Sequence, residues 1–161
     1  MGKDLRKKLE QQVGDKTDEI KMKTIGFAKN NVKKPRFGNF ADETTEIILD
    51  EQYSDALDGI EDYSHVIIVY WMDKVRGHIL KHHPQGKDVP LVGIFACRCP
   101  PRPNPIAITT VRLIERNKNV IKVQGLDIVN GTPIVDIKPY WPQYDKVTDG
   151  KIPEWVNKLE F

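Results

Sequence analysis

Residues 106–129, IAITTVRLIERNKNVIKVQGLDIV, contain the pattern that decides the fold of this 161-residue chain. In TTVRLIE (109–115) and NVIKVQG (119–125), apolar residues alternate with polar ones, as they do in half-buried strands. The polar residues RNKN (116–119) join the two runs and predict a tight turn. The stretch therefore predicts an antiparallel β-hairpin.

Other short segments rich in Val, Ile, Thr and aromatic residues lie on both sides of this hairpin. Each is bounded by Gly, Pro, Asn or Asp, which is typical of strands. HVIIVYWM is apolar on both faces and predicts a central strand. The segments expected to form strands are 24–28, 44–50, 65–72, 90–98, 106–115, 119–129 and 133–140. About seven strands with little helix favour a closed barrel or a sandwich.

Three further local patterns complete the expected fold. Asn130-Gly131 lies between two apolar runs and predicts a second hairpin turn. Residues 53–63 predict one or two helical turns, with Ser54 as N-cap and Gly59 at the end. A short C-terminal helix in 152–161 is expected to pack Trp155 and Leu159 back on the body.

The composition limits the classes of function. The formal charge is only +2, so binding to nucleic acid requires a local basic patch. Residues 1–23 are highly charged, almost lack large apolar groups, and predict a flexible extension ahead of one domain at 24–161. No signal peptide and no apolar run of membrane-spanning length is present, which predicts a soluble, cytoplasmic protein without a membrane partner.

The two cysteines, Cys97 and Cys99, do not predict a structural bridge. A disulfide at this spacing closes a strained, very small ring. A metal site needs further ligands, for which His78, His82 and His83 are the available residues, but their order before C-x-C is not a familiar zinc spacing. We therefore predict two reduced thiols and no metal.

The loop CPPRPNP (99–105) carries the first candidate chemistry. Its four prolines remove backbone donors and fix φ, so the loop cannot be a paired strand and is ordered in advance. Arg98 and Arg102 offer guanidinium forks for a carboxylate or phosphate, and Asn104 offers an amide. The alternative is that the arginines form ion pairs with acids such as Asp127 or Asp136.

A second candidate cluster lies at 124–145. Asp127 and Asp136 flank the Asn130-Gly131 turn, so a hairpin would bring their carboxylates together for general-base work or for binding hydroxyl and ammonium groups. The aromatic residues of KPYWPQY (138–144) could stack on a base or simply cover the barrel end.

The ordered pieces KTIGFAKN, Pro35-Arg36, LDGIEDYSHVIIVYW, GIFACRCPPRPNPIAITTVRLIE and GLDIVNGTPIVDIKPYWPQYD resemble the TsaA-like family. The resemblance runs from about residue 25 to 144 and rests mainly on the last two motifs. It implies a small, mainly antiparallel all-β barrel with few short helices. It also implies an S-adenosylmethionine-dependent methyltransferase that modifies N6 of threonylcarbamoyladenosine beside the tRNA anticodon.

The resemblance further implies site residues, position by position. Arg98 matches the family's cofactor arginine, Ile108 an apolar ligand contact, and Met72-Asp73 a pair that is often Phe-His in the family. The cofactor set implied is Arg36, Phe37, Gly38, Met72, Asp73, Arg98, Ile108, Gln124, Gly125, Leu126 and Asp127. Candidate bases are Asp136 and Asp127, and candidate substrate contacts are Arg102, Asn104, Lys138 and Tyr140.

Two other functions stay open at this point: a methyltransferase of the same fold with another acceptor, and a non-enzymatic module that binds S-adenosylmethionine. In either case a small barrel has few ways to roof a site made of rim loops, so we expect a homodimer with the pocket at or near its interface. For tRNA phosphates, the candidate patch is Lys33, Lys34, Arg36, Arg102 and Lys138.

Overall fold

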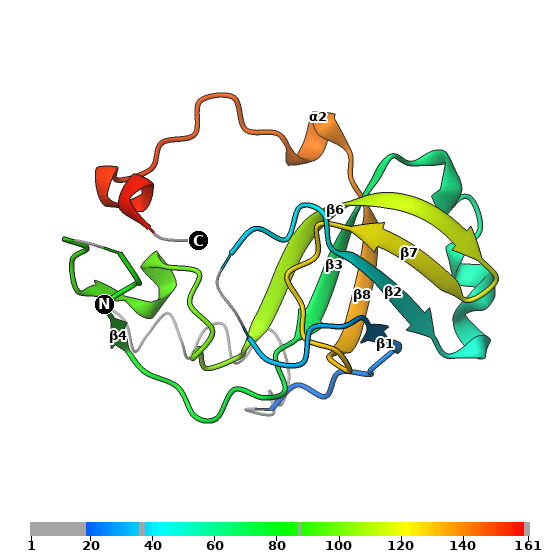
Figure 1. Cartoon of the computed structure of the whole chain (residues 1–161), viewed down its shortest axis with the longest axis horizontal. Helices are drawn as coiled ribbons and strands as arrows, with labels where there is room; N and C mark the ends of the chain where they lie inside the picture. The colour runs from blue at the N-terminus through cyan, green and yellow to red at the C-terminus, as the bar shows by residue number, and fades with distance from the viewer. Residues whose placement is uncertain (1–18, 36–37, 87, 160–161) are drawn as a thin grey trace, which may run out of the picture.

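A closed six-stranded antiparallel barrel forms the body of the computed structural model, which describes residues 19–35, 38–86 and 88–159. The strand order around the barrel is β1-β2-β7-β6-β3-β8 (Figure 1). Its strands are β1 (Gly26–Lys29), β2 (Thr44–Leu49), β3 (His65–Trp71), β6 (Ile106–Asn117), β7 (Val120–Gln124) and β8 (Pro133–Pro139). The prediction of a small all-β barrel is therefore confirmed.

The hairpin predicted at 109–125 is present as β6 and β7. Asn117 pairs with Val120, so the turn has only Lys118 and Asn119 between the strands. Lys118 has φ 53°, the left-handed backbone that a tight two-residue hairpin turn requires. The alternation that predicted the hairpin also places Val111, Ile121 and Val123 on the inner face, whereas Ile114 is exposed.

The core lies inside the barrel and follows the period-two pattern of each strand. On β3, alternate residues are buried, and this strand pairs with β6 on one side and β8 on the other, as predicted for a central strand. The fully buried apolar side chains are Ile47, Val66, Ile68, Val111, Ile121, Val123, Leu126 and Ile134, with Ile94 as a further one outside the barrel strands.

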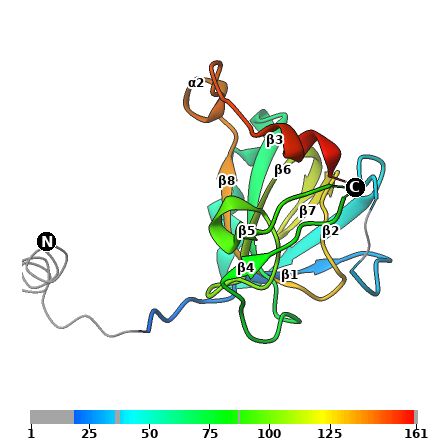
Figure 2. The same cartoon turned by 90° about the vertical axis from the view of Figure 1, so that its left-hand side faces the viewer.

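The prediction of a strand over 90–98 is wrong. Only β5 (Val92–Gly93) is extended and paired, with β4 (Lys81–His82), and the 3-10 turn η3 (Ile94–Ala96) follows at once. Leu91 and Phe95, which made the segment look like a strand, are exposed. The described residues of 74–104, here called the lobe, lie beside the barrel instead of joining it, to the left of the barrel in Figure 1 and toward the viewer in Figure 2.

The second predicted hairpin is also wrong. The chain turns at Asn130-Gly131, but β7 has already ended at Gln124, and β8 pairs with β1 and β3. Residues 125–132 instead form a loop, here called the seam loop. The apolar residues Leu126 and Ile128, which made 125–129 look like a strand, are buried in the core from a loop and take no part in strand pairing.

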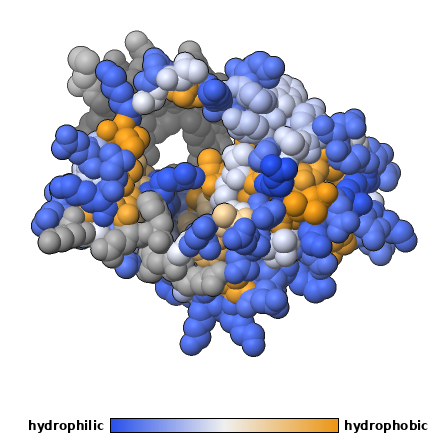
Figure 3. Space-filling model, turned by 45° about the horizontal axis from the view of Figure 1, so that its top comes forward, coloured by the Kyte–Doolittle hydropathy of each residue, from blue (hydrophilic) through white to orange (hydrophobic). Residues whose placement is uncertain are grey.

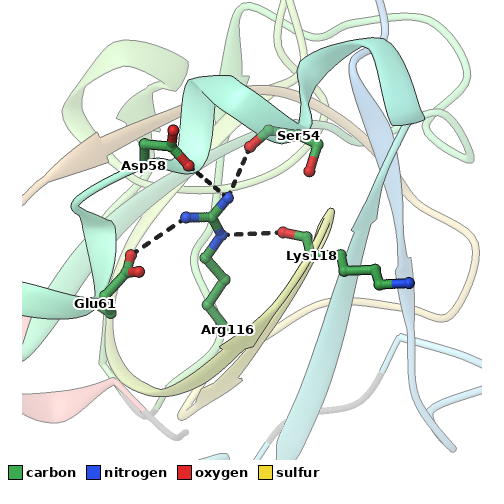
Figure 4. Close-up of polar contacts among 5 residues, drawn as sticks. All are labelled: Ser54, Asp58, Glu61, Arg116 and Lys118. Carbon is green, nitrogen blue, oxygen red and sulfur yellow. Dashed lines mark hydrogen bonds and ion pairs between the residues drawn. The ribbon is translucent and has the colours of Figure 1, made fainter.

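Two short 3-10 helices, η1 (Glu51–Leu57) and η2 (Ile60–Asp62), cover the end of the barrel beside the hairpin turn. Gly59, with φ 82°, separates them as expected, but Ser54 lies inside η1 and does not cap it. Arg116 of β6 holds both turns in place (Figure 4). Its guanidinium donates to the carbonyl of Ser54 and to the carboxylates of Asp58 (2.8 Å) and Glu61 (3.5 Å).

The C-terminal segment leaves the barrel after β8. It contains α2 (Pro142–Asp145) and η4 (Glu154–Lys158), and Leu159 forms a bridge with Gly86 of the lobe rather than with the barrel. At the other end, residues 19–23 are exposed and have no regular structure, while 1–18 of the predicted extension lie outside the described residues. Within the described part of the chain, no helix is long and apolar enough to cross a membrane.

We expect Arg116→Met to lower the thermal midpoint of unfolding, because it leaves two carboxylates and two carbonyls without their shared donor. Lys118→Met, in the exposed turn beside it, is the matched control and should leave the midpoint nearly unchanged. Differential scanning calorimetry on both variants measures the difference. Equal midpoints for the two variants would show that Arg116 does not secure the 3-10 helices.

Candidate functional site

β6 extends beyond the end of its neighbour β7, and this part of the barrel wall is here called the seam. Arg112 to Asn117 of β6 pair with β7, whereas residues 106–111 pair with β3 alone among the described strands. One edge of this half of β6 therefore lacks a neighbouring strand. An unpaired strand edge presents main-chain N–H and C=O groups to whatever lies beside it.

The seam loop runs past this edge and is held from the opposite side by Asn30. The Asn30 amide donates to the carbonyl of Ile128 (3.0 Å) and to the hydroxyl of Thr45 (3.1 Å). The Asn30 backbone N–H in turn donates to the side chain of Asn130 (3.0 Å). These bonds fix the loop in space without a strand partner.

Tyr70 crosses the seam from inside the barrel. Its side chain is only 6% exposed, and its hydroxyl donates to the carbonyl of Asp127 (2.7 Å) and lies 3.3 Å from the hydroxyl of Thr109 on β6. Burial raises the pKa of Tyr70, and the negative charge of Asp127 raises it further. The hydrogen bond with Thr109 and the positive charge of Arg98 lower the pKa of Tyr70 and so offset part of the rise. Arg98 and Asp127 therefore both lie within electrostatic reach of one hydroxyl.

Arg98 approaches the seam from the proline-rich loop. Its Nη2 donates to the carbonyl of Ile108 (3.1 Å), on the edge of β6 that has no strand beside it. The residue is exposed, and a guanidinium has five N–H donors, so most of its donors lie outside this bond. Ile108 itself is 54% exposed beside it. A cation, an apolar side chain and a strand edge thus meet at one place.

Arg102 has a structural task in the same loop. Its Nη1 donates to the carbonyls of Ile94 (2.9 Å) and Cys97 (2.8 Å), and its guanidinium carbon lies 5.6 Å from the centre of the Phe95 ring. The prolines that follow have no N–H to offer these carbonyls, so the arginine supplies the donors. Asn104 is exposed, and its carbonyl accepts from the N–H of Ile106 (2.8 Å).

The two cysteines are free thiols on either side of Arg98. Burial, together with a hydrogen bond to Cys97 and the charge of Cys97, raises the pKa of Cys99 to about 12, and the charge of Arg102 opposes this rise. Cys99 is therefore an uncharged neighbour at neutral pH and does not compete with a ligand for the charge of Arg98. Among the described residues, no group of three or more His, Cys, Asp or Glu side chains has a geometry suited to a metal ion.

The two candidate bases, Asp127 and Asp136, are not joined by a hairpin. Asp127 is exposed on the seam loop, and it is its backbone carbonyl, not its carboxylate, that accepts from the Tyr70 hydroxyl. Asp136 pairs with Val69, which pairs with Ile108, so by strand spacing Asp136 and Ile108 are about 10 Å apart across the sheet. The Asp136 carboxylate is already engaged by Lys138 (2.6 Å) and by the N–H of Ile137 (2.9 Å).

The remaining predicted cofactor residues are spread around the seam. Met72 follows β3 directly, packs on the core and donates its N–H to the carbonyl of Pro105 (2.8 Å), which places it and the exposed Asp73 beside the proline-rich loop. Gln124 ends β7, and Gly125 (φ 90°) begins the seam loop. Leu126 is fully buried, so only its backbone can face a ligand. Gly38 has open space around it, and Arg36 and Phe37 lie outside the described residues.

The four candidate substrate contacts fall into two groups. Arg102 and Asn104 lie in the proline-rich loop, close to the end of β3. Lys138 and Tyr140 lie at the opposite end: Tyr140 donates its N–H to His65 (3.1 Å), the first residue of β3. Seven residues of strand separate these ends, a distance of about 20 Å.

Two shallow hollows lie at β1, β2 and the segment that joins them. They have volumes of about 310 and 360 Å³. Neither is lined by Arg98, Tyr70 or Ile108. Their lining residues are Asn31, Val32, Lys33, Lys34 and Glu43 in one, and Lys29, Asn30, Asn31, Thr44, Thr45, Glu46 and Lys122 in the other.

Sequence reasoning did not find Tyr70 as a site residue. Within HVIIVYWM it has the appearance of one more apolar core residue, and only its hydroxyl distinguishes it. A buried tyrosine hydroxyl usually finds a polar partner, and this is the signal that was available.

Comparisons with known proteins show the family of the chain and agree with its fold. Residues 26–146 match the family described as the tRNA-methyltransferase O N-terminal domain. A probable S-adenosyl-L-methionine-binding protein of Archaeoglobus fulgidus is 44% identical over 124 residues, which are 77% of this chain and 34% of that protein. A second protein of that organism, an S-adenosyl-L-methionine-binding protein, is 40% identical over 130 residues, 78% of this chain and 93% of its own length.

Longer relatives share only this part. The tRNA (adenine(37)-N6)-methyltransferase of Homo sapiens is 38% identical over 93 residues, 56% of this chain and 21% of the human protein. The crystal structure of TrmO from Pseudomonas aeruginosa superposes with a TM-score of 0.68 at 27% identity, covering 83% of this chain and 61% of that one. The chain thus spans about a third of the first of these relatives, and less than two thirds of the solved structure.

We expect Tyr70→Phe to loosen the seam loop, because the Asp127 carbonyl loses its donor. The free energy of unfolding should fall by about 1 kcal/mol, the usual value of one such hydrogen bond. Amide hydrogen exchange should also become faster across residues 126–130. Tyr63→Phe, at a more exposed tyrosine, is the control. Unchanged exchange in the seam loop of Tyr70→Phe would remove Tyr70 from this account.

Proposed function

The chain belongs to the family of tRNA-methyltransferase O N-terminal domains, and on that premise we propose that it is an S-adenosylmethionine-dependent methyltransferase. The proposed acceptor is N6 of threonylcarbamoyladenosine beside the tRNA anticodon. The proposal is carried by two contacts at the seam: Arg98 donates to the free edge of β6 at Ile108, and the Tyr70 hydroxyl links β6 to the backbone of Asp127. A tRNA substrate also implies a cytoplasmic location.

The residues at the seam fit the cofactor chemically. S-adenosylmethionine supplies a methyl group on a cationic sulfur, and it carries an amino acid with a carboxylate and an ammonium. The exposed guanidinium of Arg98 suits the carboxylate, and Asp127 suits the ammonium or a ribose hydroxyl. The exposed side chain of Ile108 offers apolar contact. This pairing of charges supports binding of S-adenosylmethionine at the seam, although the sequence has no Gly-rich nucleotide-binding loop.

Positioning is the main contribution that these residues make to methyl transfer, since a displacement at carbon needs the acceptor held in line. The acceptor nitrogen of a ureido-adenosine is a poor nucleophile because its lone pair is delocalised, and a carboxylate near it would help to remove the proton. Asp127 and Asp136 are the candidates. The ion pair of Asp136 with Lys138 engages its carboxylate, whereas Asp127 lies on the same loop as the proposed cofactor contacts.

One specific observation favours a second candidate function. The two relatives from Archaeoglobus fulgidus are described by binding to S-adenosyl-L-methionine and not by a reaction. A module that binds this ligand without transferring its methyl group would use the same Arg98 and Asp127 contacts. Incubation with labelled S-adenosylmethionine and either total tRNA or a metabolite extract separates the candidates by which fraction becomes labelled.

We expect Arg98→Ala to weaken S-adenosylmethionine binding by one to two decades, because a charged hydrogen bond contributes about 1.5–3 kcal/mol. Asp127→Asn should weaken it as well, whereas Asp136→Asn should spare binding and slow transfer if Asp136 is the base. Isothermal calorimetry on folded variants measures the affinities. Lys118→Ala removes one positive charge far from the seam and is the control. Binding by Arg98→Ala equal to that of the parent would make the loop structural and the site assignment wrong.

We propose in addition that the protein is a homodimer with the pocket at or near the interface. Among the described residues, Arg98, Ile108 and Asp127 at the seam are exposed, and Ile106 and Ile108 lie exposed on one face of β6. Apolar groups on one strand face are the kind that a symmetric contact covers. Sedimentation at micromolar concentration should give a mass of about twice the monomer's 18.5 kDa. A monomer that still binds the cofactor tightly would contradict this.

A further inference from the structure

Charge is distributed unequally along the molecule. The described part of the lobe carries five Lys and Arg side chains and a single acid, Asp88, although the whole chain has a net charge of only +2. All five are exposed or half-buried. The lobe also carries three histidines. The five cations are Lys74, Arg76, Lys81, Arg98 and Arg102.

The opposite end of the molecule has the opposite sign. Residues 50–62, which include η1 and η2, contain six acids and no Lys or Arg. Arg116 from β6 pairs with two of them, Asp58 and Glu61, and the others keep this end acidic (Figure 4). The lobe and these 3-10 helices lie at opposite ends of the long axis (Figure 1). A polyanion is therefore attracted to the lobe and repelled from the other end.

An exposed aromatic ring lies within the basic lobe. Phe95 on η3 is 78% exposed, and the Arg102 guanidinium lies 5.6 Å from its ring centre, a cation–π distance. Arg102 is itself fixed by its bonds to Ile94 and Cys97, so the ring is supported from one side. Leu80 and Leu91 of the lobe are also exposed. At the left end of Figure 3, where the lobe and the C-terminal segment lie, apolar residues form a strip between hydrophilic ones.

We propose that the lobe is the surface that binds the single-stranded loop of the RNA substrate, with Phe95 stacking on an unpaired base. The inference rests on the proposed function and adds the docking surface to it. A supported aromatic ring among Lys and Arg side chains is the arrangement that binds unpaired nucleotides, because bases stack on the ring while cations meet the phosphates. The short path from Phe95 to Arg98 along the chain places this surface beside the proposed cofactor site.

The charge of the lobe disfavours a contact of the lobe with the lobe of a second copy. A two-fold axis through the lobe would place five cations on each side of the contact. An antiparallel two-fold pair, which would place the lobe of each copy on the acidic end of the other, is the alternative that the sedimenting mass of the lobe variants tests. The exposed isoleucines of β6 include Ile108, whose carbonyl accepts from Arg98 of the lobe, so the proposed dimer contact and the RNA surface adjoin at the seam.

The test measures binding of a labelled RNA stem-loop with an unpaired loop, and of a fully paired duplex of the same length, by fluorescence anisotropy at several salt concentrations. Lys81→Glu should weaken stem-loop binding by about tenfold and lower the salt slope by roughly 1. The matched control Lys118→Glu, at the acidic end of the barrel, should stay within about twofold of the parent protein. Phe95→Ala should weaken stem-loop binding by roughly 5- to 100-fold and leave duplex binding unchanged.

The outcomes distinguish this inference from the proposed function. If the parent protein binds S-adenosylmethionine but no RNA, the tRNA substrate is wrong and the docking surface falls with it. If the parent binds the stem-loop and Lys81→Glu matches Lys118→Glu, the lobe is not the docking surface, while the tRNA substrate stands. If Phe95→Ala changes the sedimenting mass but not the affinity for RNA, the ring belongs to a contact between copies and the inference is overturned. All variants are first compared with the parent by thermal unfolding.

Discussion

The unequal length of two neighbouring strands is the constraint on which the site depends. β6 has twelve residues and β7 has five, so half of β6 must find something other than a strand for its free edge. Arg98 donates to this edge at Ile108, and Tyr70 reaches past it to the seam loop. In a barrel whose neighbouring strands matched in length, main-chain hydrogen bonds would fill this place. The mismatch is what leaves room for side-chain chemistry in a small closed fold.

The proline-rich loop solves a related problem of unsatisfied backbone groups. Four prolines between residues 100 and 105 provide a stiff connection but no N–H donors, and the carbonyls of Ile94 and Cys97 before them need partners. Arg102 serves both carbonyls with one nitrogen, and so holds the turn from which Arg98 projects. Two arginines only four residues apart therefore have different tasks. One maintains the shape of the loop, and the other presents charge at the seam.

Much of the fold could be predicted from the sequence, because alternation of apolar and polar residues reports directly on strands with one buried face. The β6–β7 hairpin and the central position of β3 followed from that pattern. The strand predicted at 90–98 and the hairpin predicted at Asn130-Gly131 were wrong. Apolar and β-branched residues favour a strand, but they do not determine whether a segment finds a strand to pair with. Leu91 and Phe95 stay exposed on the lobe, and Leu126 is buried from a loop.

The site was predictable in part for the same reason. Motif resemblance proposed Arg98, Ile108 and Asp127 as site residues, and in the structure all three lie at the seam. It gave no sign that Arg102 is occupied by backbone carbonyls or that Asp136 is engaged by Lys138, since such contacts arise only in three dimensions. Tyr70 was hidden because a buried tyrosine in an apolar strand has the same pattern as a phenylalanine. Sequence periodicity predicts which face of a strand is buried, but it does not predict the polar contacts of single atoms.

The central claim is that S-adenosylmethionine binds at the seam between β6 and the seam loop. A titration of the ¹⁵N-labelled protein with this ligand, followed by two-dimensional NMR, tests it without any substitution. The account predicts that the largest amide shift changes occur at Arg98, at Ile108 and in the seam loop around Asp127. Changes confined to residues 31–34 and 43–46, around the two hollows on β1 and β2, with Arg98 and Ile108 unaffected, would contradict it.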